Sequence, residues 1–323
     1  MRIVVTGGAG FIGANLVREL LDAGIAERIV VVDDLSSGLR ANVPEHPSVE
    51  VVECSILSED ALDAACEGAD AIVHLAAVPS VPRSLVDPLR SHHANATGTV
   101  HVLEVARRLG AYVVVASSSS VYGDNPVLPK HEELATRPLS PYAASKLATE
   151  AYALAYASSF GLDVLAFRFF NVYGPLQAAG HAYAAVVPAF VSAALAGEEL
   201  TVYGDGLQTR DFTFVATVTR ILTAAVQGRV SSEIPLNLAF GSRTSLLELI
   251  AQLEAVVGHP VERRHLEARA GDVRDSQADN TALRERFPGL EPVPLAEGLH
   301  RTVEWMRADG GTSGETGAPG VSG

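Results

Sequence analysis

The chain has 323 residues, of which 48% are hydrophobic and 19% are charged. This composition is sufficient for a sizeable core and excludes a disordered or fibrous chain. Acidic residues outnumber basic ones by 38 to 24, and the resulting net charge of −14 argues against nucleic acid or an anionic membrane as the main partner.

We expect neither a targeting signal nor a metal motif in this sequence. The N-terminus runs straight into glycines, unlike a secretory signal. The longest apolar stretch, residues 183–197, is interrupted by a proline and a serine and is shorter than the roughly 20 residues of a membrane span. Cys54 and Cys66 lack the spacing of a disulfide framework or a metal site. We expect a cytoplasmic protein with no metal, no membrane contact and no nucleic-acid partner.

Short β-branched segments alternate with amphipathic segments over the first two-thirds of the chain. The strand candidates are apolar throughout, which is typical of strands buried on both faces. In chain order they are Arg2–Thr6, Arg28–Asp33, Val49–Glu53, Asp70–Leu75, Tyr112–Ser117 and Asp163–Phe169. Helical patterns lie between them, the first ending at Gly24 and a later one at Gly110. The alternation predicts an α/β Rossmann fold with a doubly wound parallel sheet.

A glycine-rich turn joins the first predicted strand to the first helix. Gly7 permits the tight turn, Gly10 lets the backbone approach a pyrophosphate, and Gly13 allows the helix to pack closely on the strand. The start of the helix offers free N–H groups to the anion. Asp33 stands about twenty residues after Gly13. A carboxylate at this point binds a ribose diol and repels a 2′-phosphate. This context favours NAD over NADP as the cofactor.

A hydroxyl cluster and a Tyr–Lys pair follow the fifth predicted strand. Ser118, Ser119 and Ser120 stand at its carboxyl end, where folds of this kind place their chemistry. Tyr142 and Lys146 are spaced i,i+4, so a helix places them on one face. A tyrosine acts as a base near neutral pH only if its pKa falls well below about 10. A nearby ammonium and a positive nicotinamide ring favour its phenolate.

These segments together resemble the extended short-chain dehydrogenases/reductases, specifically the NAD-dependent sugar epimerase/dehydratase family, and are closest to the UDP-hexose 4-epimerases. The resemblance covers about residues 1–308. Its motifs stand in the expected order at Thr6–Gly13, Asp33–Gly38, His74–Ala77, Asn95–Thr99, Ser118–Gly123, Tyr142–Lys146, Arg168–Pro175, Val202–Gly206, Thr209–Phe212 and Arg269–Asp272. The resemblance implies that Ser118 is the catalytic serine, Tyr142 the base and Lys146 its partner.

The resemblance also implies two sets of binding residues and a homodimer. The cofactor set is Gly7, Gly10, Phe11, Ile12, Gly13, Asp33, Asp34, Ser36, Ser37, Gly38, Ser55, Ile56, Leu75, Ala76, Ala77, Asn95, Tyr142 and Lys146. The substrate set is Ser118, Ser119, Ser120, Tyr142, Asn171, Val187, Tyr203, Arg210, Arg269, Asp272 and Ser276. In the substrate set the two arginines are implied to hold a diphosphate. The homodimer is implied to form through the helices near residues 95–108 and 142–158.

The chain departs from the family pattern at several positions. The 4,6-dehydratases carry an Asp-Glu pair where this chain has Ser119-Ser120, which cannot do the acid–base work of dehydration. Ser276 replaces a large side chain that restricts the sugar pocket in some epimerases, which leaves room for an N-acetyl group or for a different sugar orientation. The serine run is equally suited to a C6 carboxylate. Ser55 replaces the usual aspartate near the adenine, which predicts altered adenine contacts.

We therefore expect NAD-dependent epimerisation at C4 of a UDP-sugar through a transient 4-keto intermediate. UDP-glucose, UDP-N-acetylglucosamine and UDP-glucuronic acid are the candidate substrates. A UDP-glucuronate decarboxylase or another nucleotide-sugar oxidoreductase is the alternative. A non-catalytic NAD-binding protein is disfavoured because Tyr142 and Lys146 are both present.

Prolines punctuate shorter segments after about residue 170, which predicts a smaller C-terminal substrate-binding domain. We expect an NAD-binding Rossmann domain over residues 1–175, with segments interleaving at the boundary. A mainly sugar-nucleotide-binding domain over 176–308 and a disordered, glycine-rich tail over 309–323 follow.

Overall fold

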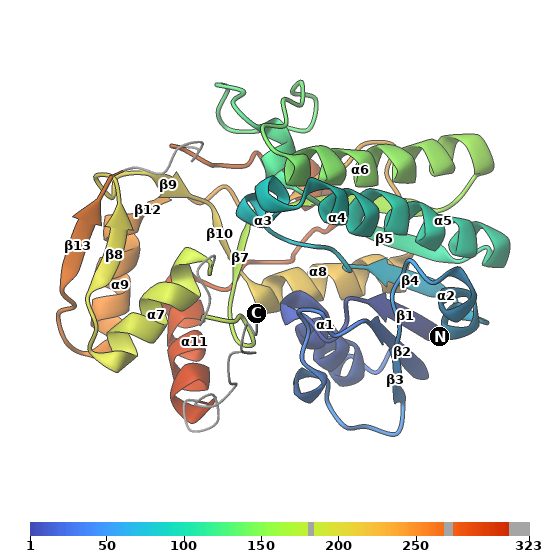
Figure 1. Ribbon diagram of the computed structural model, residues 1–323, viewed down its shortest axis with the longest axis horizontal. Helices are drawn as coiled ribbons and strands as arrows, with labels where there is room; N and C mark the ends of the chain where they lie inside the picture. Colours follow the sequence, from blue (N-terminus) through green and yellow to red (C-terminus); the bar gives the residue numbers. More distant parts are fainter. Residues whose placement is uncertain (180–183, 268–273, 310–323) are drawn as a thin grey trace, which may run out of the picture.

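The computed structural model describes residues 1–179, 184–267 and 274–309. Within these residues, a seven-stranded sheet with parallel neighbours forms the centre of the molecule (Figure 1). The strand order is β11 (Leu236–Leu238), β6 (Val164–Phe169), β5 (Tyr112–Ser118), β4 (Ala71–His74), β1 (Arg2–Thr6), β2 (Arg28–Asp33) and β3 (Val49–Glu53). The chain builds outward from β1 in both directions, which confirms the predicted doubly wound Rossmann sheet.

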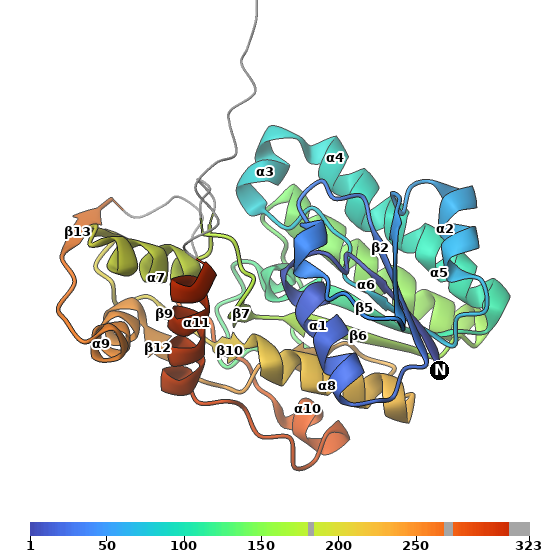
Figure 2. The same ribbon diagram turned by 90° about the horizontal axis from the view of Figure 1, so that it is seen from below.

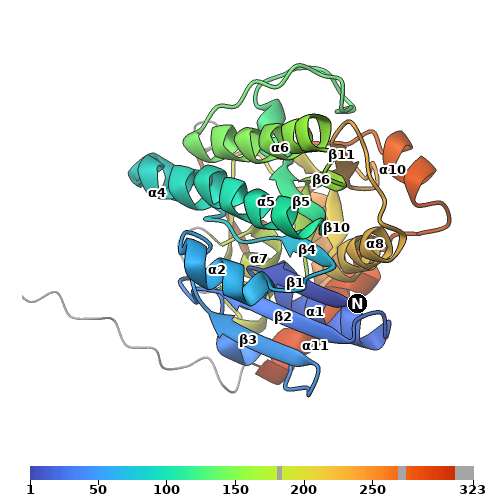
Figure 3. The same ribbon diagram turned by 90° about the vertical axis from the view of Figure 1, so that its right-hand side faces the viewer.

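The central strands are apolar because both of their faces are covered. Val5 and Val31 belong to the core on one face, and Val4 and Val30 belong to the core on the other. The two layers of helices are separated by the sheet in Figure 3. One layer holds α1 (Phe11–Asp22) and α8 (Val215–Gly228), and the other holds α2 (Glu59–Cys66), α5 (Gly98–Leu109) and α6 (Pro141–Phe160).

Several short helices connect or extend these layers. They are η1 (Arg40–Asn42), α3 (Val81–Val86), α4 (Pro88–His92), the π-helix η2 (His93–Thr97), η3 (Ser119–Tyr122) and α10 (Thr281–Arg286). The α4, η2 and α5 segments follow one another without a break, so a π-turn lies inside one long helical run. Such π-turns occur frequently at functional sites.

A smaller unit with its own core lies beside the carboxyl ends of the strands (Figure 2). Its helices are α7 (Val186–Ala196), α9 (Leu246–Val257) and α11 (Leu295–Asp309). Its strands pair as β10 (Phe212–Phe214) with β7 (Asn171–Tyr173), β12 (Thr244–Ser245) with β9 (Thr209–Arg210), and β13 (Arg263–Leu266) with β8 (Leu200–Tyr203). This unit matches the expected smaller C-terminal domain.

The chain passes between the two units more than once. After residue 175 it returns to the large sheet through α8 and β11. The domain boundary at residue 175 stays a prediction, and the predicted tail lies outside the described residues from position 310 onward. None of the helices in the described ranges has the length and apolarity that crossing a bilayer requires.

Candidate active site

A cleft of about 820 Å³ opens at the carboxyl ends of the central strands. Its lining comes from the turns after β1, β2, β4 and β5, from α6, and from residues 169–178 of the segment that leads into the smaller unit. Parallel sheets of this kind bind their ligands in this crevice, where the strand order changes direction.

The turn between β1 and α1 fits only glycine at two positions. Gly7 has a φ of +69°, and a Cβ there would lie 2.7 Å from the backbone nitrogen of Ala76. A Cβ on Gly13 would lie 2.2 Å from the carbonyl oxygen of Gly7. The first turn of α1 carries neither an acidic side chain nor a side-chain cap. Its N–H groups and positive dipole end are therefore available to a pyrophosphate, as a bound dinucleotide requires.

Asp33 fixes this turn to the end of β2. Its Oδ2 accepts a hydrogen bond from the backbone N–H of Ala9 at 2.9 Å, and its Oδ1 accepts one from Leu35 at 2.9 Å. Burial raises the pKa of Asp33, and these two bonds oppose the rise. A carboxylate has about four acceptor positions, so acceptor capacity remains for a ribose diol. The group therefore fits the adenosine side of NAD.

Ser118 ends β5 at the floor of the cleft. Its Oγ accepts hydrogen bonds from the backbone N–H of Ser120 at 3.2 Å and from the Ser120 hydroxyl at 2.9 Å. A hydroxyl oxygen has two acceptor positions, so both are in use and the proton of Ser118 is left to donate. This hydroxyl hydrogen-bonds to the phenol of Tyr142.

Tyr142 and Lys146 stand on the first turns of α6. That helix begins cleanly because the Ser140 side chain caps the N–H of Ala143 at 3.1 Å and a proline occupies its first position. Lys146 is buried and its Nζ donates to the carbonyl of Ala116 at 2.9 Å. Burial lowers the pKa of Lys146 to about 8 and raises the pKa of Tyr142, while the Ser118 hydroxyl opposes the rise on Tyr142.

Buried polar groups join α6 to the π-helix, and join β4 to β1 and α5. Asn95 in the π-helix donates to Ser145 Oγ at 2.9 Å and accepts from the backbone N–H of Val78 at 2.8 Å. His74, at the end of β4, hydrogen-bonds to Thr6 Oγ1 at 2.7 Å and to Thr99 Oγ1 at 3.0 Å. Burial lowers the pKa of His74 to about 3, with a smaller contribution from Lys146, so its ring is neutral.

A buried ion pair supports the same helix. Arg168 on β6 donates to both carboxylate oxygens of Glu150 on α6, at 2.6 and 3.0 Å. Ser117 donates to the same carboxylate at 2.8 Å. The guanidinium also lies over the ring of Tyr122, 4.7 Å from its centre. These contacts join β5, β6 and α6 directly beneath Ser118 and Lys146.

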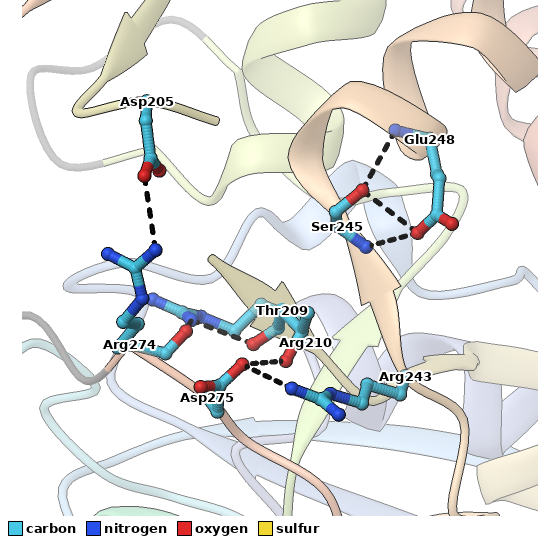
Figure 4. A network of polar contacts seen from close by, with 8 residues as sticks. All are labelled: Asp205, Thr209, Arg210, Arg243, Ser245, Glu248, Arg274 and Asp275. Carbon is cyan, nitrogen blue, oxygen red and sulfur yellow. Dashed lines mark hydrogen bonds and ion pairs between the residues drawn. The ribbon is translucent and has the colours of Figure 1, made fainter. Parts of the chain in front are cut away.

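A second cleft of about 440 Å³ lies next to the first, in the smaller unit. It is lined by Asn171, Val187, Tyr203 and Arg210, all members of the expected substrate set. Arg210 donates through Nη1 to the carbonyl oxygens of Thr209 at 2.9 Å and Arg274 at 3.3 Å (Figure 4). A planar guanidinium at this position is suited to phosphate oxygens.

The expected cofactor residues mostly line the large cleft. These are Gly7, Gly10, Phe11, Ile12, Gly13, Asp33, Asp34, Ser36, Ser37, Ser55, Ile56, Leu75, Ala76, Ala77, Tyr142 and Lys146, with Ser118 beside them. The described linings of the two clefts leave out Gly38, Asn95, Ser119, Ser120 and Ser276. Gly38 packs against Asp33, and Asn95 supports α6. Arg269 and Asp272 lie outside the described residues.

The linings also contain residues that the sequence reasoning did not select. Arg90, His93 and Gln177 line the large cleft, and Gln208 lines the small one. None of them belongs to a motif. The one signal for them is their position, because a helix that follows the carboxyl end of a parallel strand passes this edge of the sheet. Within the ranges that the structure describes, no group of three or more His, Cys, Asp or Glu side chains is arranged to hold a metal ion.

The glycine turn, the acidic residue at the end of β2 and the Ser–Tyr–Lys set on a Rossmann sheet define a dinucleotide-dependent enzyme of the short-chain dehydrogenase/reductase type. Residues 3–239 match the model of the NAD dependent epimerase/dehydratase family, and the chain belongs to that family. Its cofactor is NAD.

Known relatives extend over nearly the whole chain. The UDP-glucose 4-epimerase of Mycolicibacterium smegmatis is 40% identical over 315 residues, which cover 95% of this chain and 99% of that protein. The UDP-glucuronic acid decarboxylase 1 of Xenopus tropicalis is 34% identical, covering 95% of this chain and 72% of that protein. A solved UDP-N-acetylglucosamine 4-epimerase from Methanobrevibacter ruminantium has a TM-score of 0.90 and 34% identity, covering 95% of this chain and 98% of that one. The family resemblance expected from the sequence is confirmed.

Proposed function

We propose that the chain is an NAD-dependent epimerase acting at C4 of a UDP-sugar. The convergence of Ser118, Tyr142 and Lys146 in the dinucleotide cleft carries this proposal. The adjoining cleft, with Arg210 in its wall, has the size and charge for a nucleoside diphosphate. Two serines, Ser119 and Ser120, occupy the positions that a dehydratase needs for acid–base work, which favours epimerisation over dehydration.

Tyr142 takes the proton of the 4-hydroxyl group as C4 loses its hydride, which leaves a 4-keto sugar. Bound NAD supplies the acceptor for that hydride and a positive charge that favours the phenolate. Ser118 donates its proton toward the reacting oxygen, because Ser120 occupies both of its acceptor positions. Lys146 holds the nicotinamide ribose and favours the phenolate through its ammonium. When the 4-keto sugar turns over, the hydride returns to its other face and Tyr142 returns its proton to the 4-oxygen, so C4 is inverted with no net oxidation.

We assign the cofactor and substrate roles on the same basis. The first turn of α1 holds the pyrophosphate and Asp33 holds the adenosine ribose. Asn171 and Tyr203 contact the uridine side, and Arg210 contacts the diphosphate. Arg269 and Asp272 join them as the second clamp that the family resemblance implies. The division into an NAD-binding part and a sugar-nucleotide-binding part follows from these assignments.

A substrate panel tests this function. Purified enzyme is incubated separately with UDP-glucose, UDP-N-acetylglucosamine and UDP-glucuronic acid, and the C4 epimers are resolved by chromatography and NMR. We expect at least one sugar to reach an equilibrium mixture of its two C4 epimers, without accumulation of reduced cofactor. Failure to interconvert any of the three would contradict the proposal.

Decarboxylation of UDP-glucuronic acid is the second candidate, because a decarboxylase is 34% identical over 314 residues. It would begin with the same oxidation at C4 and end with loss of the C6 carboxylate as carbon dioxide. Release of carbon dioxide from UDP-glucuronic acid, with a UDP-pentose as the product, would favour this candidate. A uronic acid recovered intact as its C4 epimer would exclude it.

We also propose that two copies associate through the layer of α3, α4, α5 and α6. Apolar side chains on this side stand exposed in the single chain: Leu85 at 65%, Val86 at 80%, Leu89 at 67% and Tyr152 at 45%. The helices that carry them, α3, α4 and α6, pack against one another (Figure 1). Exposed apolar side chains gathered on one layer of helices are typical of an interaction site.

A further inference from the structure

Asp211 lies directly behind the wall of the smaller cleft. Its neighbours in the chain, Arg210 and Phe212, both line that cleft, whereas Asp211 itself is absent from the described lining. Its exposed fraction is 0%. A buried carboxylate is costly unless hydrogen bonds replace those that it would make with water. The hydrogen-bond partners of Asp211 therefore indicate its role.

The carboxylate of Asp211 joins three segments that are distant in the sequence. Its Oδ2 accepts hydrogen bonds from the backbone N–H of Gly241 at 2.9 Å and of Ala278 at 3.1 Å, which are 30 and 67 positions away. Its Oδ1 accepts one from the hydroxyl of Ser242 at 2.9 Å. The loop after β11 and the segment that follows residue 273 are thereby fixed to the strand pair that carries Arg210.

The backbone of Asp211 adds a fourth segment. Its carbonyl oxygen accepts from the backbone N–H of Asn171 at 3.3 Å and from the Asn171 side chain at 3.5 Å. Asn171 and Arg210 both line the smaller cleft. One residue therefore sets the spacing of two proposed ligand-binding side chains and the position of the loops beside them.

Other contacts in this region are more exposed. Figure 4 shows Asp275 bonded to Thr209 and Arg243, and Arg274 reaching Asp205. The Arg243–Asp275 pair has side-chain exposures of 57% and 26%, and the Arg274–Asp205 pair has 67% and 49%. Exposed pairs contribute little to stability. The buried carboxylate is the stronger link, because removing it would leave the N–H groups of Gly241 and Ala278 without an acceptor.

We propose that Asp211 is a positioning residue for the nucleoside-diphosphate part of the substrate, setting the affinity of the smaller cleft without touching the ligand. This inference rests on the proposed function. It assigns the role to the hydrogen bonds of the side chain rather than to its charge. Asparagine at this position can accept from both backbone N–H groups and donate to the Ser242 hydroxyl, so it meets the same demands without a charge.

The test compares Asp211→Ala and Asp211→Asn with the parent enzyme. Calorimetry gives the Kd for UDP and, separately, for NAD, and kinetics gives KM and kcat. For Asp211→Ala we expect the Kd for UDP and the KM to rise by about tenfold or more. We expect the Kd for NAD and the kcat at saturation to stay within about twofold. Asp211→Asn should recover most of the affinity.

Two further variants keep the test decisive. Ser242→Ala removes one donor only and should weaken UDP binding in the same direction by a smaller factor, even if Asp211→Ala fails to fold. Glu254→Ala removes a carboxylate that accepts from the backbone N–H of Val261 at 3.0 Å in the same unit, and should leave UDP binding unchanged. Unchanged UDP affinity in Asp211→Ala and Ser242→Ala, or an equal loss in Glu254→Ala, would overturn the inference. If the parent enzyme binds no UDP at all, the proposed function itself is wrong.

Discussion

Tyr142 lies in surroundings that oppose its ionisation. Burial raises the pKa of its phenol. The hydrogen bond from Ser118 lowers that pKa by less than burial raises it. Burial also lowers the pKa of Lys146 to about 8, so its ammonium is held in a site that penalises charge. The chain alone thus keeps the base in its neutral form, and the proposed proton transfer depends on positive charge brought to the site by the cofactor.

Replacing Tyr142 with phenylalanine separates binding from chemistry at this residue. Only the hydroxyl is lost, so the cleft keeps its shape while the proton of the 4-hydroxyl group loses its acceptor. We expect Tyr142→Phe to lower turnover by on the order of 10²–10⁴-fold and to leave the Kd for NAD within about twofold. Initial rates and calorimetric titration measure the two effects. Turnover close to that of the parent enzyme would remove Tyr142 from the proposed mechanism.

At the scale of elements, the start of α1 depends on close approach to the β1 turn. A methyl group on Gly13 would lie 2.2 Å from the carbonyl oxygen of Gly7, so the helix would have to move. We expect Gly13→Ala to lower the melting temperature and to weaken NAD binding by more than about tenfold, since the helix N-terminus no longer meets the pyrophosphate. Gly228→Ala in α8 is the control, because its Cβ meets only a side-chain methyl group of Val230, at 3.2 Å. Equal NAD affinity in both variants would contradict this account.

The end of β4 makes stability depend on pH through His74. Its pKa falls from 6.5 to about 3 in the folded chain. Between these values the unfolded chain binds more protons, so the free energy of unfolding falls as the pH falls, by at most about 1.4 kcal/mol per unit. We expect His74→Gln to show a shallower slope in denaturation experiments between about pH 4 and 6.5. His92→Gln, at an exposed position in α4, should keep the parent slope, and identical slopes in all three proteins would count against a buried neutral His74.

The long buried strands were predictable because burial on both faces leaves an uninterrupted apolar signal. The segment Arg2–Thr6 has the predicted bounds, and the predicted strand Asp70–Leu75 is one residue longer at each end than β4. The three-residue β11 and the two-stranded sheets of the smaller unit were missed, since such short strands show no periodicity and form only through tertiary contacts.

The candidate site also has residues that the sequence predicts and residues that it does not. Gly13, Asp33 and Tyr142 stand in motifs whose local order suffices to place them at the cleft. Asp211 and Ser120 act through partners, and the partners of Asp211 are 30 and 67 positions away in the sequence. A contact over that distance depends on the complete fold, so the sequence pattern around Asp211 carries no sign of it.

At the scale of the whole molecule, the proposed function requires a chain with a net charge of −14 to bind two diphosphate groups. The fold meets this demand locally. The first turn of α1 is free of acidic side chains at the large cleft, and Arg210 lines the small one. Overall charge therefore bears on solubility and nonspecific association, whereas ligand binding depends on the few groups that face each cleft.

The proposed homodimer is also tested on the whole molecule. Light scattering after size exclusion should give about twice the 33.9 kDa of one chain. Changing both Val86 and Leu89 to aspartate should shift the protein toward the monomer, because two charges would be buried in an apolar contact. Leu207→Asp, at a position 54% exposed in the smaller unit, is the control and should stay dimeric. A monomeric parent protein would contradict the proposed assembly.

The central claim is that C4 of a UDP-sugar loses a hydride and regains the same hydride on its other face. A UDP-sugar from the panel that reacts, labelled with deuterium at C4, tests this most directly. We predict that both C4 epimers appear, that the deuterium remains at C4 in each, and that it does not exchange with the hydrogen of water. Loss of the label to solvent, or a product with unchanged configuration at C4, would contradict the account.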